Sequence, residues 1–262
     1  MFVDLEDVRL AYPSDHGEVL ALDGLTMGIG EGEFAAVVGP SGCGKSSLMR
    51  LATGLQRPQA GRITVDGKAV TGPLSITGMA FQNPSLLPWR TTLSNVMLPL
   101  EIVRPHRQRL KREKAAYTQK AEALLSLVGL KGFGSRYPWQ LSGGMQQRAN
   151  LCRALIHDPV LLMLDEPFGA LDAFTREELW GVMQDLHMEK RFTVILVTHD
   201  LREAAYLADR IFVMSARPGR IIAERTVPFP RPRSSEVIYE KAFVDLVHDL
   251  RGHIADARRE AA

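Results

Sequence analysis

The stretch Gly39-Pro-Ser-Gly-Cys-Gly-Lys-Ser46 decides the fold. It fits the pattern G-x-x-x-x-G-K-[S/T], and it stands between the apolar run Phe34-Ala-Ala-Val-Val38 and residues 47–55, which look helical. In such a loop the glycines let successive backbone N–H groups turn toward an anion, and the start of the helix adds partial positive charge. The sequence therefore predicts a buried strand, a phosphate-binding loop and a helix, in that order.

Polar residues of this loop have expected roles. Lys45 is expected to reach the β- and γ-phosphates of a nucleotide, and the Ser46 hydroxyl to ligate Mg²⁺. Cys43, beside Lys45 at a helix N-terminus, is expected to have a lowered thiol pKa and to be protected from alkylation by ATP. The alternative is a glycine-rich turn that binds nothing, which the flanking strand and helix disfavour. The expected ATP contacts are Gly39, Pro40, Ser41, Gly42, Cys43, Gly44, Lys45, Ser46 and Ser47.

A pair of acidic residues follows a second buried strand. Residues 160–164 are apolar and lead directly into Asp165 and Glu166. Ligands bind at the carboxyl edge of open α/β sheets, so Asp165 is expected to hold Mg²⁺ and Glu166 to act as general base on an attacking water. Two acids in a solvated turn are the alternative, which the upstream phosphate loop makes less favourable.

Alternating strand and helix patterns indicate an α/β protein with a mainly parallel sheet. An antiparallel β region comes first, the part from residue 83 to about 159 is helical in character, and the α/β pattern then resumes. The closing segment contains an extended stretch, residues 228–233, and an amphipathic helix. The expected strands cover residues 2–10, 19–29, 34–38, 78–81, 160–164 and 193–197, hairpins turn at 66–67 and 217–219, and helices cover 47–55, 110–127, 142–156, 176–189 and 201–208.

Composition excludes several classes of protein. The chain has 262 residues, of which 45% are hydrophobic and 24% charged, so it is long enough to bury a core without disulfides. A formal net charge of +2 gives no broad electrostatic footprint for nucleic acid, and no nucleic-acid partner is expected. Two cysteines cannot build a disulfide framework, and no apolar run is long enough to cross a bilayer.

Residues Leu141-Ser-Gly-Gly-Met-Gln-Gln-Arg148 open a helix and form a second glycine-containing helix N-terminus. Together with the phosphate loop and the acidic strand end, they make the chain resemble the ATP-binding subunits of ABC transporters from residue 2 to about residue 222. The resemblance implies a P-loop NTPase cassette with a mixed core sheet, an N-terminal antiparallel β subdomain and a helical signature subdomain. It implies a cassette over residues 1–230, with the helical subdomain at about 83–159, followed by a linker and C-terminal helix over 231–262.

The resemblance also assigns roles to single positions. It implies that Tyr12 stacks on adenine, that Gln82 senses Mg²⁺ and the attacking water, that Asp172 lies in a dimer-contact loop, and that His199 is the switch histidine. Each of these side chains taken alone is more often a packed or solvated group. The signature implies that two copies join head to tail and that one copy contacts the ATP of the other through Leu141, Ser142, Gly143, Gly144 and Met145. Met145 and Gly169 depart from the commonest family residues, which are Gln and Ser.

Two further strings, residues 165–176 and 214–220, resemble importers of the nitrate, sulfonate and taurine group. The resemblance implies a bacterial subunit bound peripherally at the cytoplasmic face of the inner membrane. Its partners would be a second copy, two integral membrane permease subunits and, indirectly, an extracytoplasmic solute-binding protein. Residues 81–90 would meet the permease, or Leu86, Leu87 and Trp89 would instead pack on the helical insertion.

Two other functions stay open at this point. One is an ABC ATPase that acts on ribosomes or DNA, which the single cassette and the near-neutral charge disfavour. The other is a nucleotide-dependent scaffold that does not hydrolyse ATP, which Glu166 and His199 disfavour. The closing helix could pack on its own chain, on a second copy or on a membrane subunit, and helical spacing does not distinguish these.

Overall fold

The computed structural model describes residues 1–14 and 17–259. The chain divides into two compact units, of which the first contains Met1–Leu74 and Gln184–Ala262 and the second contains Ser75–Met183. The boundary at residues 183 and 184 falls within helix α6, Ala173–Lys190.

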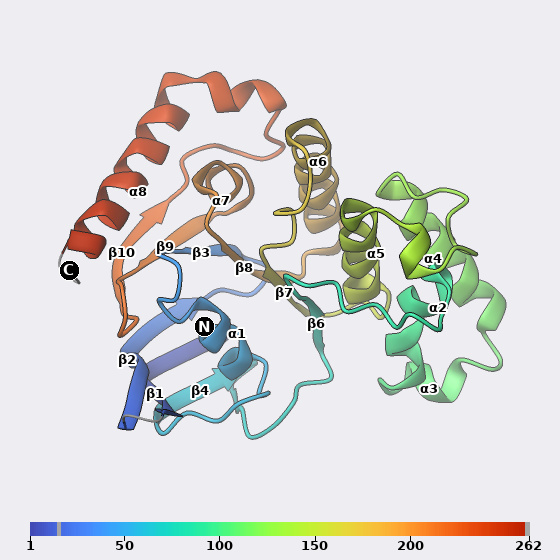
Figure 1. Ribbon diagram of the computed structural model, residues 1–262, viewed down its shortest axis with the longest axis horizontal. Helices are drawn as coiled ribbons and strands as arrows, with labels where there is room; N and C mark the ends of the chain where they lie inside the picture. Colours follow the sequence, from blue (N-terminus) through green and yellow to red (C-terminus); the bar gives the residue numbers. More distant parts are fainter. Residues whose placement is uncertain (15–16, 260–262) are drawn as a thin grey trace. The chain divides into compact units, whose positions relative to one another are not determined.

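An antiparallel sheet forms the N-terminal part of the first unit (Figure 1). Its strand order is β2-β1-β4-β5, and the bounds are Val3–Ser14 for β1, Gly17–Ile29 for β2, Ala60–Val65 for β4 and Lys68–Ala69 for β5. The predicted hairpin is present because Asp66 and Gly67 both have positive φ angles, 52° and 68°, which a two-residue turn between twisted strands requires. The predicted antiparallel β subdomain is confirmed.

A second group of four strands carries the phosphate loop. Their order is β10-β9-β3-β8, with bounds Phe34–Val38 for β3, Thr193–Thr198 for β8, Arg210–Met214 for β9 and Ile221–Thr226 for β10. Strand β3 is parallel to both β8 and β9, whereas β10 is antiparallel to β9. Every residue of β3 and β8 is buried, which explains why their sequences are continuously apolar rather than alternating.

Three helices of the first unit frame this sheet. Helix α1, Lys45–Ala52, follows the loop, α7, Leu201–Leu207, follows β8, and α8, Lys241–Arg259, ends the described chain. The short helix η3, Ser235–Tyr239, precedes α8. Figure 1 shows α8 beside α7, and it packs on α7 and β9 through the buried residues Phe243, Leu250 and Ala257, which recur every seven positions. The closing helix therefore packs on its own chain.

The extended segment before α8 is anchored in the interior of the first unit. Arg233 is only 5% exposed, and its Nη1 donates to the carbonyl oxygens of Tyr206 at 2.7 Å and Ala208 at 2.8 Å. The backbone N–H of Arg233 donates to Gln184 Oε1 at 2.7 Å. The last carbonyl oxygens of a helix have no hydrogen-bond partner inside the helix. At the end of α7, the Arg233 guanidinium donates hydrogen bonds to these oxygens. The segment has the predicted lack of regular structure, but it is fixed by a buried side chain.

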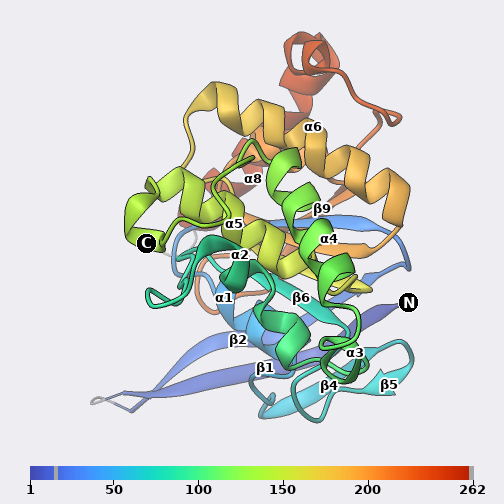
Figure 2. The same ribbon diagram turned by 90° about the vertical axis from the view of Figure 1, so that its right-hand side faces the viewer.

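The second unit contains two parallel strands and a group of helices. Strands β6, Thr77–Ala80, and β7, Leu161–Asp165, pair with each other in parallel. Figure 2 shows α4 and α5 side by side, and these two helices are in contact. The helical elements before β7 are α2 (Thr92–Val96), η1 (Leu98–Glu101), α3 (His106–Arg109), α4 (Lys114–Leu127), η2 (Pro138–Gln140) and α5 (Gly143–Leu155).

The buried arginine gives a stability prediction. Arg233→Met keeps much of the side-chain volume but removes every donor, so buried carbonyl oxygens at the end of α7 lose their partners. We expect the free energy of unfolding to fall by about 3 kcal/mol. Arg225→Met is the control, because Arg225 pairs with Asp249 at a partly exposed position, and there the loss should stay below about 1 kcal/mol. Urea denaturation measures the free energy of unfolding of both variants. Equal losses would show that Arg233 does not anchor the segment before α8.

Candidate functional site

The phosphate loop lies between β3 and α1, as predicted. Gly42 and Gly44 have φ angles of 75° and 108°, a region that residues with a Cβ rarely adopt. A Cβ at Gly44 would also lie 2.7 Å from Leu22 Cδ2 and 3.0 Å from the Ala21 carbonyl oxygen. The loop conformation therefore requires glycine for two independent reasons, backbone angle and close approach to β2.

Lys45 lies at the first position of α1 with its side chain folded into the loop. The residue is 7% exposed, and its Nζ donates to the carbonyl oxygens of Gly39 at 2.9 Å and Pro40 at 2.8 Å. An ammonium held among backbone carbonyls at the start of a helix adds its full charge to the partial charge of the helix terminus. The position suits Lys45 to bind phosphate oxygens.

The prediction that the Cys43 thiol has a lowered pKa is wrong. Cys43 is 1% exposed, and burial raises the pKa of its thiol, although the neighbouring Lys45 acts in the opposite direction. The thiolate is the form that loses most by leaving water, and here this loss exceeds the attraction of one ammonium. The thiol therefore faces the protein interior, and the structure gives no support for the expected reactivity.

A turn from the other end of the first unit closes over the loop. The turn after β9 brings Arg217 to the loop, where its Nη2 donates to the Gly42 carbonyl oxygen at 3.0 Å. Gly219 lies still closer, because a Cβ there would be 2.2 Å from the Cys43 carbonyl oxygen. Its N–H donates to the Ala21 carbonyl oxygen of β2 at 2.9 Å. Sequence reasoning assigned this turn to a hairpin and to a string that resembles importers, and it missed that the turn shapes the phosphate loop.

Two more predicted site residues belong to the first unit. Tyr12, on β1, shares a hydrogen bond with Ser47 Oγ at 3.0 Å and donates to Gln56 Oε1 at 2.9 Å. These bonds fix the ring next to α1. His199 is exposed between the last residue of β8 and Asp200, which begins α7 by accepting from the N–H groups of Arg202 and Glu203. The stacking role of Tyr12 and the switch role of His199 stay predictions.

The second unit brings Gln82 and Glu166 together. Because β6 and β7 are parallel, the residues that follow them meet at one edge, where Gln82 Nε2 donates to Glu166 Oε2 at 2.9 Å. Asp165 is the last residue of β7. Glu166 has a φ of 46°, which is uncommon for a residue with a side chain and is typical of positions under functional constraint. The amide and carboxylate could together orient a water molecule.

A buried asparagine holds the loop that follows Gln82. Asn95 donates through Nδ2 to the carbonyl oxygens of Leu87, Arg90 and Thr91, each at 3.1 Å, and accepts from the N–H of Leu87 at 2.7 Å. Sequence reasoning missed Asn95, since a single polar residue in a helix carries no motif. The loop conformation is therefore specified although it lacks regular structure.

The signature residues begin α5. Ser142 caps this helix by accepting from the N–H of Met145 at 3.3 Å, and Ser142 and Gly143 are exposed. Leu141 is buried, and a Cβ on Gly144 would meet Leu171 Cδ2 at 2.9 Å. The arrangement leaves an open helix N-terminus, which can attract an anion.

Asp172 has a local structural role at the start of α6. It accepts from Thr175 N at 3.0 Å and from Thr175 Oγ1 at 2.8 Å, and these hydrogen bonds lower the pKa of its carboxyl group. The side chain is exposed and stays charged. Its role in dimer contact stays a prediction.

Comparison with known proteins gives a consistent result. The family model described as "ABC transporter" matches residues 22–169. The aliphatic sulfonates import ATP-binding protein SsuB of Bacillus licheniformis is 44% identical over 218 residues, which is 82% of each chain. The bicarbonate transport ATP-binding protein CmpD of Synechocystis sp. is 42% identical, over 91% of this chain and 83% of its own. A solved dimer of the ATP-binding cassette MJ0796 with ADP and Pi has a TM-score of 0.76 and 30% identity, and it covers 87% of this chain and 100% of its own.

The turn around Gly219 gives a prediction about nucleotide binding. Gly219→Ala places a methyl group against the Cys43 carbonyl oxygen, so the loop must shift and ATP affinity should fall at least about tenfold. Arg217→Gln removes the bonds to Gly42 without a clash and should cost about threefold. Binding of a fluorescent ATP analogue measures both.

Gly252→Ala is the matched control for this prediction. Gly252 lies within α8 with no atom near its would-be Cβ, and its φ is not positive, so nucleotide affinity should be unchanged. Normal ATP affinity in a folded Gly219→Ala variant would show that the turn does not shape the loop.

Proposed function

The chain belongs to the ABC transporter family and is an ATP-binding ATPase subunit, and from this premise we propose that it powers import of a small solute. The observation that carries the proposal is the phosphate loop with Lys45 folded into it, in a chain 44% identical to a sulfonate-import subunit. The transport subunits named among its relatives act on aliphatic sulfonates and bicarbonate, both of which are small anions. Nitrate, sulfonate or taurine importers are the group we propose.

The proposed reaction is hydrolysis of ATP by water. The phosphate loop and Lys45 bind the phosphates, Glu166 accepts the proton of the attacking water, and Gln82 orients that water through its amide. The hydrogen bond between Gln82 and Glu166 supports this division of work. His199 follows β8 in the same unit as the loop and is assigned the role of switch histidine.

Mg²⁺ is the proposed metal. The assigned ligands are Ser46, Gln82 and Asp165, which offer a hydroxyl, an amide oxygen and a carboxylate. All three are hard oxygen donors of the kind that Mg²⁺ prefers, so the donor set fits this ion. When bound, the ion would neutralise charge on the phosphates.

A second copy of the chain is the first proposed partner. The cassette MJ0796, similar over its whole length, has been solved as a dimer. The exposed start of α5 supports a head-to-tail arrangement in which Leu141, Ser142, Gly143, Gly144 and Met145 of one copy contact ATP on the other. Closure on ATP and release after hydrolysis would form a two-state clamp.

Two membrane permease subunits are the second proposed partner. In the loop after Gln82, Leu86 is 8% exposed and packs within the unit, whereas Trp89 is 71% exposed. Leu86 therefore packs on its own unit, and the exposure of Trp89 supports a contact between this side chain and a partner. No helix within residues 1–14 and 17–259 is long and apolar enough to cross a membrane. We propose peripheral binding at the cytoplasmic face, with residues 1–230 as cassette and the solute delivered by an extracytoplasmic binding protein.

Substitution of the proposed base tests the chemistry. Glu166→Gln keeps the size of the side chain but removes the proton acceptor, so ATP turnover should fall about 10³-fold while ATP affinity stays within about twofold. Glu178→Gln, at an exposed position on α6, is the control and should retain turnover. Phosphate release measures turnover, and a Glu166→Gln variant with normal turnover would refute the assignment.

Co-purification tests the transport role. Tagged Glu166→Gln protein, held with Mg-ATP and isolated from detergent-solubilised source cells, should recover a membrane subunit with several spans, identified by mass spectrometry. Adding Trp89→Ala should reduce that recovery, whereas Tyr239→Ala, which changes an aromatic residue of similar exposure on η3, should not. Recovery of ribosomes or DNA-bound proteins in place of a membrane subunit would overturn the importer proposal.

A further inference from the structure

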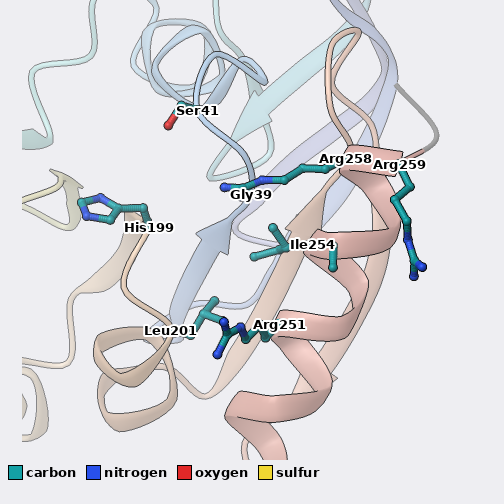
Figure 3. Close-up of a pocket in the computed structure, with 9 residues that line it drawn as sticks. Gly39, Ser41, His199, Leu201, Arg251, Ile254, Arg258 and Arg259 are labelled. Carbon is teal, nitrogen blue, oxygen red and sulfur yellow. The ribbon is translucent and has the colours of Figure 1, made fainter. Parts of the chain in front are cut away.

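The pocket of about 750 Å³ beside the phosphate loop, shown in Figure 3, belongs to the first unit and to the site already described. A separate group of polar side chains lies in the second unit on α5, which packs on β6. Gln147 and Asn150 are 2% and 0% exposed, and Arg153 is half-buried. Their spacing of three residues places them on one face of the helix. Buried polar side chains need hydrogen-bond partners, and the partners of these three indicate their role.

Helix α5 lies directly against β6. A Cβ at Gly78 of β6 would be 2.1 Å from the Ala154 carbonyl oxygen of α5, so the two backbones approach as closely as glycine allows. The segment 81–85 follows β6, carries Gln82, and is a largely exposed stretch without helix or strand. The polar face of α5 supplies the contacts that hold this segment.

Asn150 and Gln147 bind the residue that precedes Gln82. Asn150 Nδ2 donates to the Phe81 carbonyl oxygen at 2.9 Å, and Gln147 Nε2 donates to the same oxygen at 3.3 Å. This oxygen belongs to the planar peptide group that also contains the Gln82 nitrogen. Two hydrogen bonds from α5 therefore fix the peptide group from which Gln82 begins.

Arg153 binds the other end of the segment. Its Nη2 donates to the Pro84 carbonyl oxygen at 2.6 Å, and its Nη1 donates to the Ser85 carbonyl oxygen at 3.1 Å. The same guanidinium donates to Asn150 Oδ1 at 2.7 Å, which joins the two anchors. Ser85 has a φ of 44°, which is uncommon for a residue with a side chain, and the fork of donors helps to hold this conformation.

Helix electrostatics do not account for these contacts. Arg153 lies in the last turn of α5, where any cation stabilises the partial negative charge of the helix C-terminus. That effect explains the charge of the side chain but not the direction of its donors, which bind the segment 81–85 and Asn150. Arg148 on the same helix provides a contrast, because its Nη1 donates at 3.0 Å to the Val128 carbonyl oxygen at the end of α4.

We propose that Asn150 and Arg153 are positioning residues for ATP hydrolysis, because they hold the backbone on both sides of Gln82 and so keep its amide beside Glu166. The distance from Gln82 Nε2 to Glu166 Oε2 is 2.9 Å. The inference rests on the proposed function, in which Gln82 orients the attacking water. A small displacement of this amide slows the reaction, whereas the phosphate loop belongs to the first unit and keeps its affinity for ATP.

Substitution of Arg153 tests the role of the second anchor. Arg153→Gln removes the fork of donors, so kcat should fall about tenfold while the Kd for ATP stays within about twofold. Arg148→Gln is the matched control, since it makes the same change on the same helix at a side chain that binds the end of α4. Its kcat should stay within about twofold of the wild-type value. Phosphate release measures kcat, and a fluorescent ATP analogue measures Kd.

A double-mutant cycle separates positioning from a general loss of stability. If Arg153 acts through Gln82, adding Arg153→Gln to Gln82→Ala should lower kcat by less than about twofold, because the positioned amide is already absent. A merely structural role predicts the same fall of about tenfold in both backgrounds. Asn150→Asp tests the first anchor in the same cycle, because it still accepts from Arg153 but places an acceptor against the Phe81 carbonyl oxygen.

Hydrogen exchange gives a readout that does not depend on turnover, measured on the full chain without nucleotide. The backbone amides of residues 82–86 should exchange about fivefold faster in Arg153→Gln and in Asn150→Asp, as the loss of a hydrogen bond implies. Arg148→Gln should leave this segment unchanged and speed up exchange at residues 128–130. If Arg153→Gln does not fold, Arg153→Lys, which keeps the charge but not the fork, replaces it with the same expected directions.

The proposal is wrong if folded Arg153 and Asn150 variants keep the wild-type kcat, or if exchange at residues 82–86 is unchanged. It is also wrong if the effects of Arg153→Gln and Gln82→Ala on kcat are independent. Failure of the proposed function gives a different result. A wild-type chain that does not hydrolyse ATP, or a Gln82→Ala variant with normal turnover, would contradict the role of Gln82 and the positioning role with it.

Discussion

Close backbone contact around the phosphate loop is the constraint on which the rest of the first unit depends. Gly44 approaches the Ala21 carbonyl oxygen of β2, and Gly219 approaches the Cys43 carbonyl oxygen from the opposite end of the chain. Neither contact leaves room for a side chain. The loop is therefore held between an antiparallel sheet and a hairpin turn. Contacts from both of them help to orient the amide groups of the loop.

Charge around the loop follows from this packing. The carbonyl oxygens of Gly39 and Pro40 turn toward Lys45, and the Gly42 carbonyl oxygen is bonded by Arg217. Carbonyls engaged in this way do not oppose an approaching anion, while the N–H groups at the start of α1 remain directed outward. The close packing of the backbone thus determines both the shape of the site and its preference for negatively charged ligands.

The sequence predicted what depends on local pattern. Apolar runs and turn residues predicted three features that the structure contains. These are the order of strand, loop and helix at 34–52, the parallel strands and the antiparallel β subdomain. The error at Cys43 has a physical cause, because the sequence shows that Lys45 is near but does not show that the Cys43 side chain is buried. Asn95 and Arg233 belong to no motif, so only tertiary contact shows their roles.

The pairing of β3 with β8 and β9 has a consequence for biosynthesis. Strand β3 is finished early in translation, but the strands on both its sides begin at Thr193 and Arg210, and the turn that closes on the phosphate loop comes later still. The nascent chain cannot satisfy the backbone groups of β3 until those segments have left the ribosome. The loop therefore gains its final form only when most of the chain has been made, so an unfinished chain lacks the structure needed to bind ATP.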